Sequence, residues 1–570
     1  MDSETSTNGA QTPTTPKRSS TLALTEYAAN PSPRNCTPSG ERNQIPLYNV
    51  PQSFLLPNGY PDYLRLILTS RVYDVVTETP LSYAVNLSNR LETKVLLKRE
   101  DLLPVFSFKL RGAYNKMAHL SSEEKWKGVI ACSAGNHAQG VAYSARHLKM
   151  PATIVMPSGT PAIKHKNVSR LGGNVVLHGA DFDSAKEHCH MLEKQHGLTN
   201  IPPFDDPYVI AGQGTIGKEI LQQASLQNLK VIFCCVGGGG LIAGIGTYVK
   251  RIAPDVKIIG VEANDANAMI QSLKAGKRVV LKDVGLFADG AAVKAVGEET
   301  FRICQEVVDD VVTVTTDEIC AAIKDTFEDT RSILEPAGAL SLAGLKKWVA
   351  QNPSDDPNRE LVAVTSGANM NFDRLRFVAE RATFGEQKEA LLTVTIPEKP
   401  GAFAALVEAI LPAAVTEFSY RYNTREPSKA HILVGVSISN ASSRSTELDS
   451  LFSRLEQGGM TPRDVSDDEV AKTHIRYLNG GRSSVSDERL YMFEFPERPG
   501  ALFTFLRTLR PGQNISLFHY RNYGGDIGRI LAGIQCPEEK RGELHGFLKE
   551  IGYPWTECTE NETCKTFLRE

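Results

Sequence analysis

Lys109 is the residue whose surroundings most clearly suggest covalent chemistry. It stands in SFKLRGA (107–113), directly after Ser107 and Phe108, where a helix is expected to begin. A lone lysine is most often a solvated surface charge. Among bulky apolar neighbours its amine would be partly desolvated, which lowers the amine pKa and makes it a nucleophile. Lys109 is therefore a candidate nucleophile.

The stretch SAGNHAQG (133–140) has the composition of a carboxylate-binding loop. It follows an apolar run, and its small residues would let backbone N–H groups approach an anion at the positive end of the next helix. Asn136 adds a directional side-chain donor. A tight strand-to-helix turn explains this loop in isolation equally well.

The stretch VGGGGLIAG (236–244) has the composition of a phosphate cradle. Four consecutive glycines cost backbone entropy, so a pure turn would rarely use them, whereas exposed amides at a helix start bind phosphate. A dinucleotide fingerprint, Gly238-x-Gly240-x-x-Ala243 with Glu262 ending a later strand, is the competing interpretation. No Gly-Lys-Ser/Thr follows, which excludes a Walker A loop.

A hydroxyl completes the set at Ser366 in VTSGAN (364–369). It could contact a ring nitrogen, although capping a helix is the commoner role of such a serine. Pyridoxal phosphate requires an amine for the Schiff base, a phosphate cradle and a partner for its pyridine nitrogen. The loop at 133–140 would then hold the carboxylate of an amino-acid substrate. These residues together predict a pyridoxal-phosphate enzyme.

The elements that must position these groups alternate between short apolar runs and helical stretches from about residue 80 to 380. One such helix is predicted at 181–196, ending at Gly197. This alternation predicts parallel strands with crossover helices, hence an α/β domain whose ligands bind at the carboxyl ends of strands. The predicted strands are Gly128–Ser133, Thr153–Pro157, Val175–His178, Val231–Val236, Ile258–Glu262 and Leu361–Thr365.

From about residue 388 the chain repeats itself. The stretches TVTIPEKPGAF, FSYRY and HILVGVSI, which begin at 393, 418 and 431, match MFEFPERPGAL, FHYRN and RILAGIQC at 492, 518 and 529. The offsets (492 − 393 = 99, 518 − 418 = 100, 529 − 431 = 98) agree closely, so we expect two copies of one module. The order strand, helix, strand, strand, helix is compatible with a ferredoxin-like α+β unit.

These motifs resemble the fold-type II family of pyridoxal-phosphate enzymes and, within it, the biosynthetic threonine dehydratases (threonine deaminases). The stretches KREDLLPVFSFK (98–109) and FDDPYVIAGQGTIGKEI (204–220) support the same resemblance, which covers roughly 50–570. It implies a catalytic domain of open twisted sheets flanked by helices at 51–385. Two ACT-like regulatory modules are then expected at 388–480 and 488–570, after a disordered leader at 1–50.

The resemblance also implies a role for each site residue. Lys109 would form the Schiff base, Phe108 would lie against the cofactor ring, and Ser366 would face the pyridine nitrogen. Asn136 would contact the cofactor 3-hydroxyl and help to surround the substrate carboxylate. The phosphate would be bound by Gly237, Gly238, Gly239, Gly240 and Leu241, and the substrate carboxylate by Ser133, Ala134, Gly135, Asn136 and His137. His137 is equally well explained as a loop histidine without a chemical role.

The activity implied is the deamination of L-threonine, with L-serine as a secondary substrate, to 2-oxobutanoate and ammonia. This β-elimination of water, with Lys109 as general base, is a carbon–nitrogen lyase reaction and the first step of isoleucine biosynthesis. Isoleucine would inhibit through the C-terminal modules and valine would oppose it, in a homotetramer. The recurring residues Tyr420, Arg421, Tyr520 and Arg521 are candidate effector contacts, with packing between modules as the alternative.

Three other functions compete with this interpretation. Serine dehydratase, serine racemase and threonine synthase would share the lysine and the cradle, although the C-terminal repeat argues against the first two. A nicotinamide oxidoreductase would use the Gly238 fingerprint, with Glu262 at the ribose. A non-enzymatic amino-acid sensor would retain the fold with a vestigial site.

Composition excludes several partners. The chain has 570 residues and a formal net charge of −3, so it lacks the positive excess of a nucleic-acid or membrane-surface protein. No apolar run is long enough to span a membrane, and no cysteine or histidine spacing predicts a metal site. The ten cysteines are expected to be free thiols in a reducing compartment.

The predicted leader is rich in Ser, Thr and Pro and poor in large apolar residues. Its Ser/Thr content fits a mitochondrial import signal, whereas its acidic residues do not. A mitochondrial location is therefore expected, with the cytoplasm as the alternative.

Overall fold

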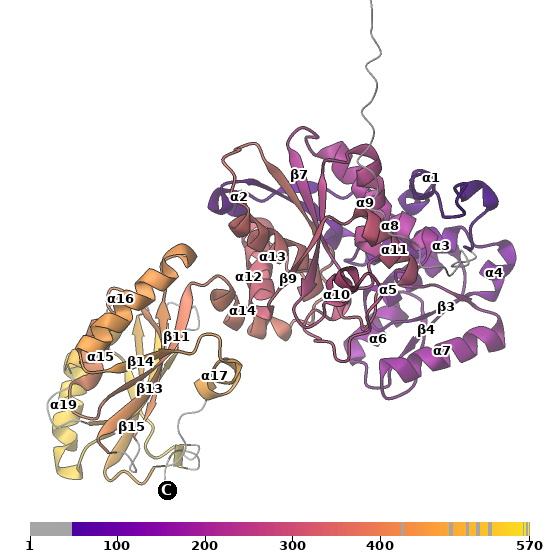
Figure 1. Cartoon of the computed structure of the whole chain (residues 1–570). Helices are drawn as coiled ribbons and strands as arrows, with labels where there is room; N and C mark the ends of the chain where they lie inside the picture. Colours follow the sequence, from indigo (N-terminus) through magenta and orange to yellow (C-terminus); the bar gives the residue numbers. More distant parts are fainter. Residues whose placement is uncertain are drawn as a thin grey trace, which may run out of the picture. The chain divides into compact units, whose positions relative to one another are not determined.

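The computed structural model describes residues 48–422, 427–477, 483–496, 501–508, 514–521, 527–561, 564–565 and 568. Apart from its last three residues, the leader predicted at 1–50 lies outside this range. Among the described residues, no helix combines the length and apolar character needed to cross a bilayer. The described strands form three sheets, two in the N-terminal part and one in the C-terminal part (Figure 1).

The smaller N-terminal sheet is parallel and has the order β5-β4-β3-β6. Three of its strands lie within one residue of the predicted ones at each end. The bounds are β3 (Val129–Cys132), β4 (Ala152–Met156), β5 (Asn174–Leu177) and β6 (Thr199–Asn200). Helix α7 (Phe182–His196) ends at Gly197 in the left-handed conformation, φ 61°, as predicted. The α/β alternation is therefore confirmed here.

The larger N-terminal sheet has the order β1-β2-β10-β7-β8-β9 and is parallel except for β1. Its central strands are buried along almost their whole length, which explains their continuous apolar runs. The strands β1, β2 and β9 were not predicted. The bounds are β1 (Leu81–Tyr83), β2 (Lys94–Arg99), β7 (Leu229–Cys235), β8 (Lys257–Ala263), β9 (Asp310–Val314) and β10 (Glu360–Thr365).

Helix α3 (Lys109–Ala118) carries the candidate lysine at its first position and packs against α5 and α8. Gly112 permits this close packing, because a Cβ there would lie 2.8 Å from the carbonyl oxygen of Val209. The other helices of this part flank the two sheets (Figure 1). They include α1 (Tyr63–Leu68), α2 (Val85–Leu91), α4 (Ser122–Lys127), α5 (Asn136–Leu148), α6 (Ala162–Arg170), α8 (Pro207–Gln223), α9 (Gly240–Ile252), α10 (Ala268–Ala275), α11 (Glu298–Val307), α12 (Thr316–Thr330), α13 (Pro336–Gln351) and α14 (Arg374–Gly385).

The C-terminal part forms one antiparallel sheet of order β14-β11-β13-β12-β16-β17-β15-β18. The order is mirrored about the β12–β16 pair, so each repeat supplies four strands in ferredoxin-like order and the two repeats share one sheet. We call the β12–β16 pair the module junction. The strands are β11 (Glu389–Pro397), β12 (Val415–Arg421), β13 (Lys429–Ser437), β14 (Thr461–Asp464), β15 (Glu488–Pro496), β16 (Asn514–Arg521), β17 (Ile527–Gln535) and β18 (Trp555–Glu557). The helices are α15 (Ala402–Ile410), α16 (Arg444–Gln457), α17 (Glu469–Thr473), α18 (Ala501–Thr508) and α19 (Arg541–Ile551).

Candidate active site

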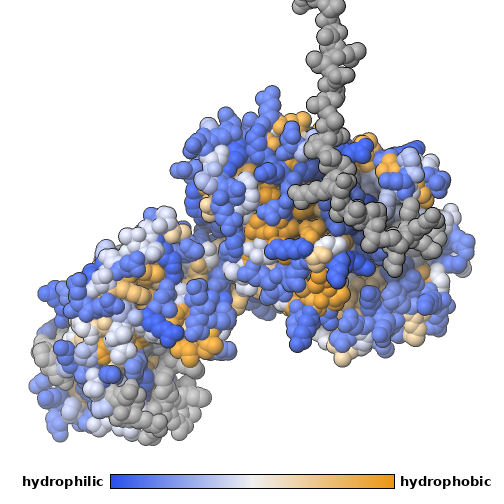
Figure 2. Space-filling model, viewed as in Figure 1, coloured by the Kyte–Doolittle hydropathy of each residue, from blue (hydrophilic) through white to orange (hydrophobic). Residues whose placement is uncertain are grey.

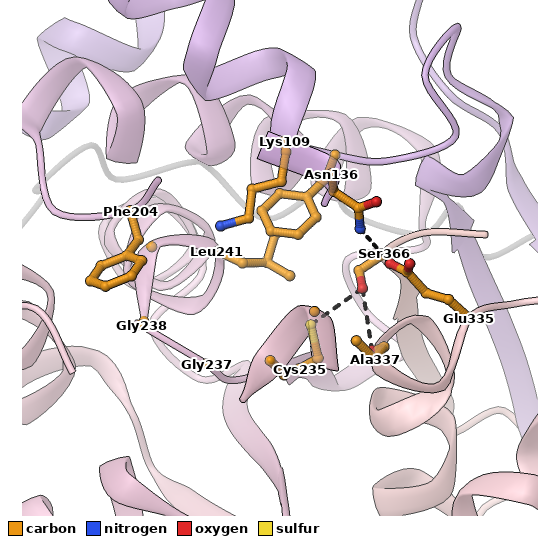
Figure 3. A pocket seen from close by; sticks show the side chains of 15 residues that line it. Lys109, Asn136, Phe204, Cys235, Gly237, Gly238, Leu241, Glu335, Ala337 and Ser366 are labelled. Carbon is orange, nitrogen blue, oxygen red and sulfur yellow. Dashed lines mark hydrogen bonds between the residues drawn. The ribbon is translucent and has the colours of Figure 1, made fainter. Parts of the chain in front are cut away.

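One pocket brings together residues from strand ends and helix starts that are distant in the sequence (Figure 3). It contains all of the predicted cofactor contacts. The lining residues are Phe108, Lys109, Asn136, Phe204, Cys235, Gly237, Gly238, Gly239, Gly240, Leu241, Gly290, Ala291, Glu335, Ala337 and Ser366. Because β7 and β10 are parallel neighbours, the loops that follow them meet at the same edge of the sheet.

The Lys109 side chain extends into this pocket (Figure 3). Its amine donates a hydrogen bond to the carbonyl oxygen of Pro203 at 2.7 Å, and the Phe108 ring centre lies 5.3 Å from Nζ. Burial lowers the pKa of the Lys109 amine to about 8. A useful fraction of the amine is therefore neutral near physiological pH, as a nucleophile requires.

The glycine loop between β7 and α9 has the geometry of an anion cradle. Within the described residues, the backbone N–H groups of Gly237, Gly238 and Gly239 have no hydrogen-bond acceptor. The Gly238 carbonyl instead accepts from Thr300 Oγ1 at 2.6 Å. Gly239 has φ 95°, and a Cβ at Gly238 would lie 2.2 Å from the Phe204 ring. Only glycine fits at position 238, and the three unpaired N–H groups can bind an anion.

The residue that follows β10 brings a neutral hydroxyl to the pocket. Ser366 is buried, and its hydroxyl accepts from the Cys235 thiol at 3.3 Å and donates to the Ala337 carbonyl at 3.4 Å (Figure 3). Burial raises the pKa of Cys235 to about 11, so the thiol stays protonated. A ring nitrogen beside Ser366 would meet a neutral hydroxyl.

Asn136 is held by two residues that the sequence analysis did not identify. Its Nδ2 donates to Glu335 Oε1 at 2.5 Å, and its Oδ1 accepts from Asn369 Nδ2 at 2.8 Å. Burial raises the pKa of the Glu335 carboxyl to about 7. Glu335 precedes Pro336 at the start of α13, a pattern that signals a helix start but not a pocket.

Of the residues predicted to bind the substrate carboxylate, Asn136 lines the pocket, whereas Ser133, Ala134, Gly135 and His137 lie beside it. Ser133 and Gly135 form the turn before α5, where the Gly135 N–H donates to Ser133 Oγ at 3.3 Å, and Ala134 lies between them. His137 is buried, and its Nε2 donates to the carbonyl of Ile201 at 2.7 Å. Burial lowers the pKa of His137 to about 3, so the ring is neutral and tied to the main chain.

The four candidate effector residues lie on the two strands of the module junction. The Tyr420 hydroxyl donates to Glu398 Oε2 at 2.5 Å, and Arg421 pairs with Glu488 of the other repeat at 2.5 Å. Tyr520 is buried opposite Phe418 in the strand register. The side chain of Arg521 lies outside the described residues. Of the two described pairs, Arg421–Glu488 joins the two repeats and Tyr420–Glu398 lies within the first.

The acid of the competing dinucleotide fingerprint has another partner. The Glu262 carboxylate is buried and accepts from the backbone N–H groups of Met269 and Ile270, at 2.8 and 2.9 Å, at the start of α10. It is therefore not available to a ribose hydroxyl. The pocket instead offers an amine, unpaired amides and a neutral hydroxyl, and this donor set fits pyridoxal phosphate.

Known proteins show the same organisation. The profile of the pyridoxal-phosphate dependent enzymes matches residues 72–367, and that of the C-terminal regulatory domain of threonine dehydratase matches 380–475 and 479–568. The mitochondrial threonine dehydratase of Schizosaccharomyces pombe is 57% identical over 538 residues, 94% of this chain and 89% of the relative. The biosynthetic L-threonine dehydratase of Burkholderia multivorans is 53% identical over 511 residues, 89% of this chain and 99% of the relative.

Among solved structures, the processed form of threonine deaminase isoform 2 from Solanum lycopersicum is similar to this chain with a TM-score of 0.55 and 53% identity. The similarity covers 56% of this chain and 92% of that chain. The fold, the pocket and these relatives agree. The chain belongs to the threonine dehydratase family of pyridoxal-phosphate-dependent enzymes, and it carries the family's C-terminal regulatory domain.

Proposed function

We propose that this enzyme deaminates L-threonine to 2-oxobutanoate and ammonia, with L-serine as a secondary substrate. The observation that carries the proposal is the Lys109 amine, with its lowered pKa, in one pocket with the unpaired amides of Gly237 to Gly239. These amides bind the cofactor phosphate, and Phe108 packs against its ring. Ser366 gives the ring nitrogen a neutral partner.

Bound pyridoxal phosphate supplies an aldehyde for the substrate amine and an electron sink for the charge that develops at the substrate Cα. Lys109 Nζ removes the proton from that carbon as general base, and the β-hydroxyl takes up a proton and leaves as water. Hydrolysis of the released enamine then gives 2-oxobutanoate and ammonia. The N–H groups at the start of α5 bind the substrate carboxylate, where the helix end is positive.

The test is keto-acid formation from L-threonine and L-serine by the full chain loaded with pyridoxal phosphate. Borohydride reduction and peptide mapping should place the cofactor on Lys109. A Lys194→Ala variant, which removes an exposed lysine of α7, is the control and should still carry the cofactor on Lys109. A reduced adduct on another lysine, or protein without visible absorbance, contradicts the proposal.

The regulatory domain supports control by amino acids in the same pathway. Isoleucine inhibits, valine opposes it, and Tyr420, Arg421, Tyr520 and Arg521 contact the effector. Initial rates of the full chain with isoleucine, and then with added valine, test this directly. Rates that isoleucine leaves unchanged exclude feedback control.

A mitochondrial location follows the naming of the S. pombe relative. The enzyme also assembles as a homotetramer, as the resemblance to the family implies. Light scattering should give about four times the chain mass of 62.4 kDa. A leader–reporter fusion that stays in the cytosol contradicts the location.

A further inference from the structure

The Glu335 carboxyl is unusual among the groups at the pocket because, within the described residues, it is buried without a salt bridge. The charged groups that act on it from a distance are Lys109 in the pocket and Asp289, Lys164 and Arg374 outside its lining. Glu335 is 5% exposed and, in the part of the chain that the structure describes, its one hydrogen-bond partner is Asn136. The position of Glu335 is fixed through its backbone, because the Glu335 N–H donates to the Gly367 carbonyl at 3.1 Å. A Cβ at Gly367 would lie 2.4 Å from Oε1. Burying an unpaired carboxylate is costly, so this arrangement calls for a functional explanation.

The hydrogen bonds around Asn136 have only one consistent direction. Asn369 Nδ2 donates to the carbonyl of Val105 at 2.7 Å, and a carbonyl can only accept. The same amide nitrogen therefore donates its second N–H to Asn136 Oδ1. The other end of the Asn136 amide must then be the nitrogen, which donates to Glu335.

This chain of contacts leaves one N–H of Asn136 unused. An amide nitrogen has two N–H groups, and Glu335 takes one of them. Asn136 lines the pocket, and its amide end faces the space between Lys109 and Ser366 (Figure 3). The amide is thus held as a donor toward any oxygen atom of a ligand in that space.

We propose that Glu335 and Asn369 are positioning residues that hold the Asn136 amide as a hydrogen-bond donor to the 3-oxygen of pyridoxal phosphate, and that the Glu335 charge sets the protonation of the bound cofactor. The proposal rests on the proposed function, because it needs the cofactor in this pocket. A negative charge behind Asn136 favours the cofactor form that carries one more proton.

Glu335→Gln tests the charge with little change in shape. Without substrate, the visible absorbance of the bound cofactor should titrate about one pH unit lower than in the wild-type protein, because the negative charge that retains the proton is gone. The matched control is Glu262→Gln, which changes another buried carboxyl away from the pocket and should leave the titration unchanged. A Glu335→Gln titration equal to that of the wild type overturns the role of the charge.

Asn369→Asp tests the direction of the amide. An aspartate here places an acceptor against the Asn136 amide oxygen and the Val105 carbonyl, so the donor that fixes the Asn136 amide is lost and its N–H is no longer held toward the pocket. Cofactor affinity should fall on the order of tenfold, as expected for a lost buried hydrogen bond. Equal affinity overturns the positioning role, and this variant decides the matter if Glu335→Gln fails to fold. Wild-type protein without visible absorbance would instead refute the proposed function itself.

Discussion

The pocket around Lys109 and the module junction differ in how far their polar groups are paired with other protein groups. In the pocket, counting contacts with the described residues only, the N–H groups of Gly237, Gly238 and Gly239 are unpaired and the Glu335 carboxyl has one hydrogen-bond partner. At the junction, Tyr420 and Arg421 are already paired with the carboxylates of Glu398 and Glu488. An anionic ligand can bind the glycine-loop amides without displacing a protein group from them. An effector that uses Arg421 must first displace the Glu488 carboxylate. Under the proposal that Arg421 contacts the effector, binding would require a rearrangement of the junction.

On the face drawn in Figure 2, hydrophilic residues predominate, and apolar residues gather in several patches on both described parts.

The largest expected effect is on the pocket side of this comparison. Lys109→Ala removes both the covalent anchor and the general base, so kcat should fall by roughly a thousandfold or more. Steady-state rates with L-threonine measure it, and Lys194→Ala should match the wild type. An alanine variant that keeps a tenth of the wild-type rate would end the assignment.

The next effect breaks the internal pairing at the junction. Arg421→Met leaves Glu488, which is 2% exposed, without its cation, and should cost about 3–5 kcal/mol of unfolding free energy in the C-terminal part. Calorimetry of the full chain measures it. The control is Arg376→Met, whose side chain is 79% exposed and whose ion pair should be worth under about 1 kcal/mol. Equal unfolding of both variants would show that the junction is not held by this pair.

A smaller effect concerns the space in the cradle. In Gly238→Ala the new methyl would meet the Phe204 ring, so the loop must shift and cofactor affinity should fall about a hundredfold, or roughly 2.7 kcal/mol. Titration with pyridoxal phosphate measures it. Gly159→Ala introduces a methyl with no atom within 4 Å and should bind normally. Normal binding by both variants would place the phosphate elsewhere.

The smallest effect is on pH dependence. The apo-protein captures the cofactor through a neutral amine, and the pKa of Lys109 is about 8. The neutral fraction, and with it the rate of covalent capture, should rise about tenfold between pH 7 and pH 9 and then level off. Stopped-flow absorbance measures the rate. A rate that is independent of pH in this range would mean that capture is not limited by the protonation of Lys109.

Much of the pocket could be predicted from the sequence because its parts lie in short continuous stretches. Lys109 at a helix start and the glycines between a strand and a helix are local patterns with a local physical cause. Glu335, Asn369 and Phe204 could not be found this way. Their roles depend on tertiary contacts with residues far away in the chain, such as the 199-residue separation between Glu335 and Asn136.

The fold shows the same division. Strands with continuous apolar runs were predicted to within two residues. Strand β1 has only three residues, and charged or polar residues interrupt or flank the apolar ones in β2 and β9. The two C-terminal repeats were found from their matching motifs. Their union into a single sheet was not, since no local pattern specifies which strand pairs with β12.

Through the β12–β16 pairing, each repeat covers a strand edge of the other repeat with backbone hydrogen bonds. A chain that ended after the first repeat would present β12 as a bare edge whose unpaired N–H and C=O groups can recruit a strand from another molecule. Frameshifts or nonsense changes late in the reading frame should therefore yield insoluble protein rather than a shortened, unregulated enzyme.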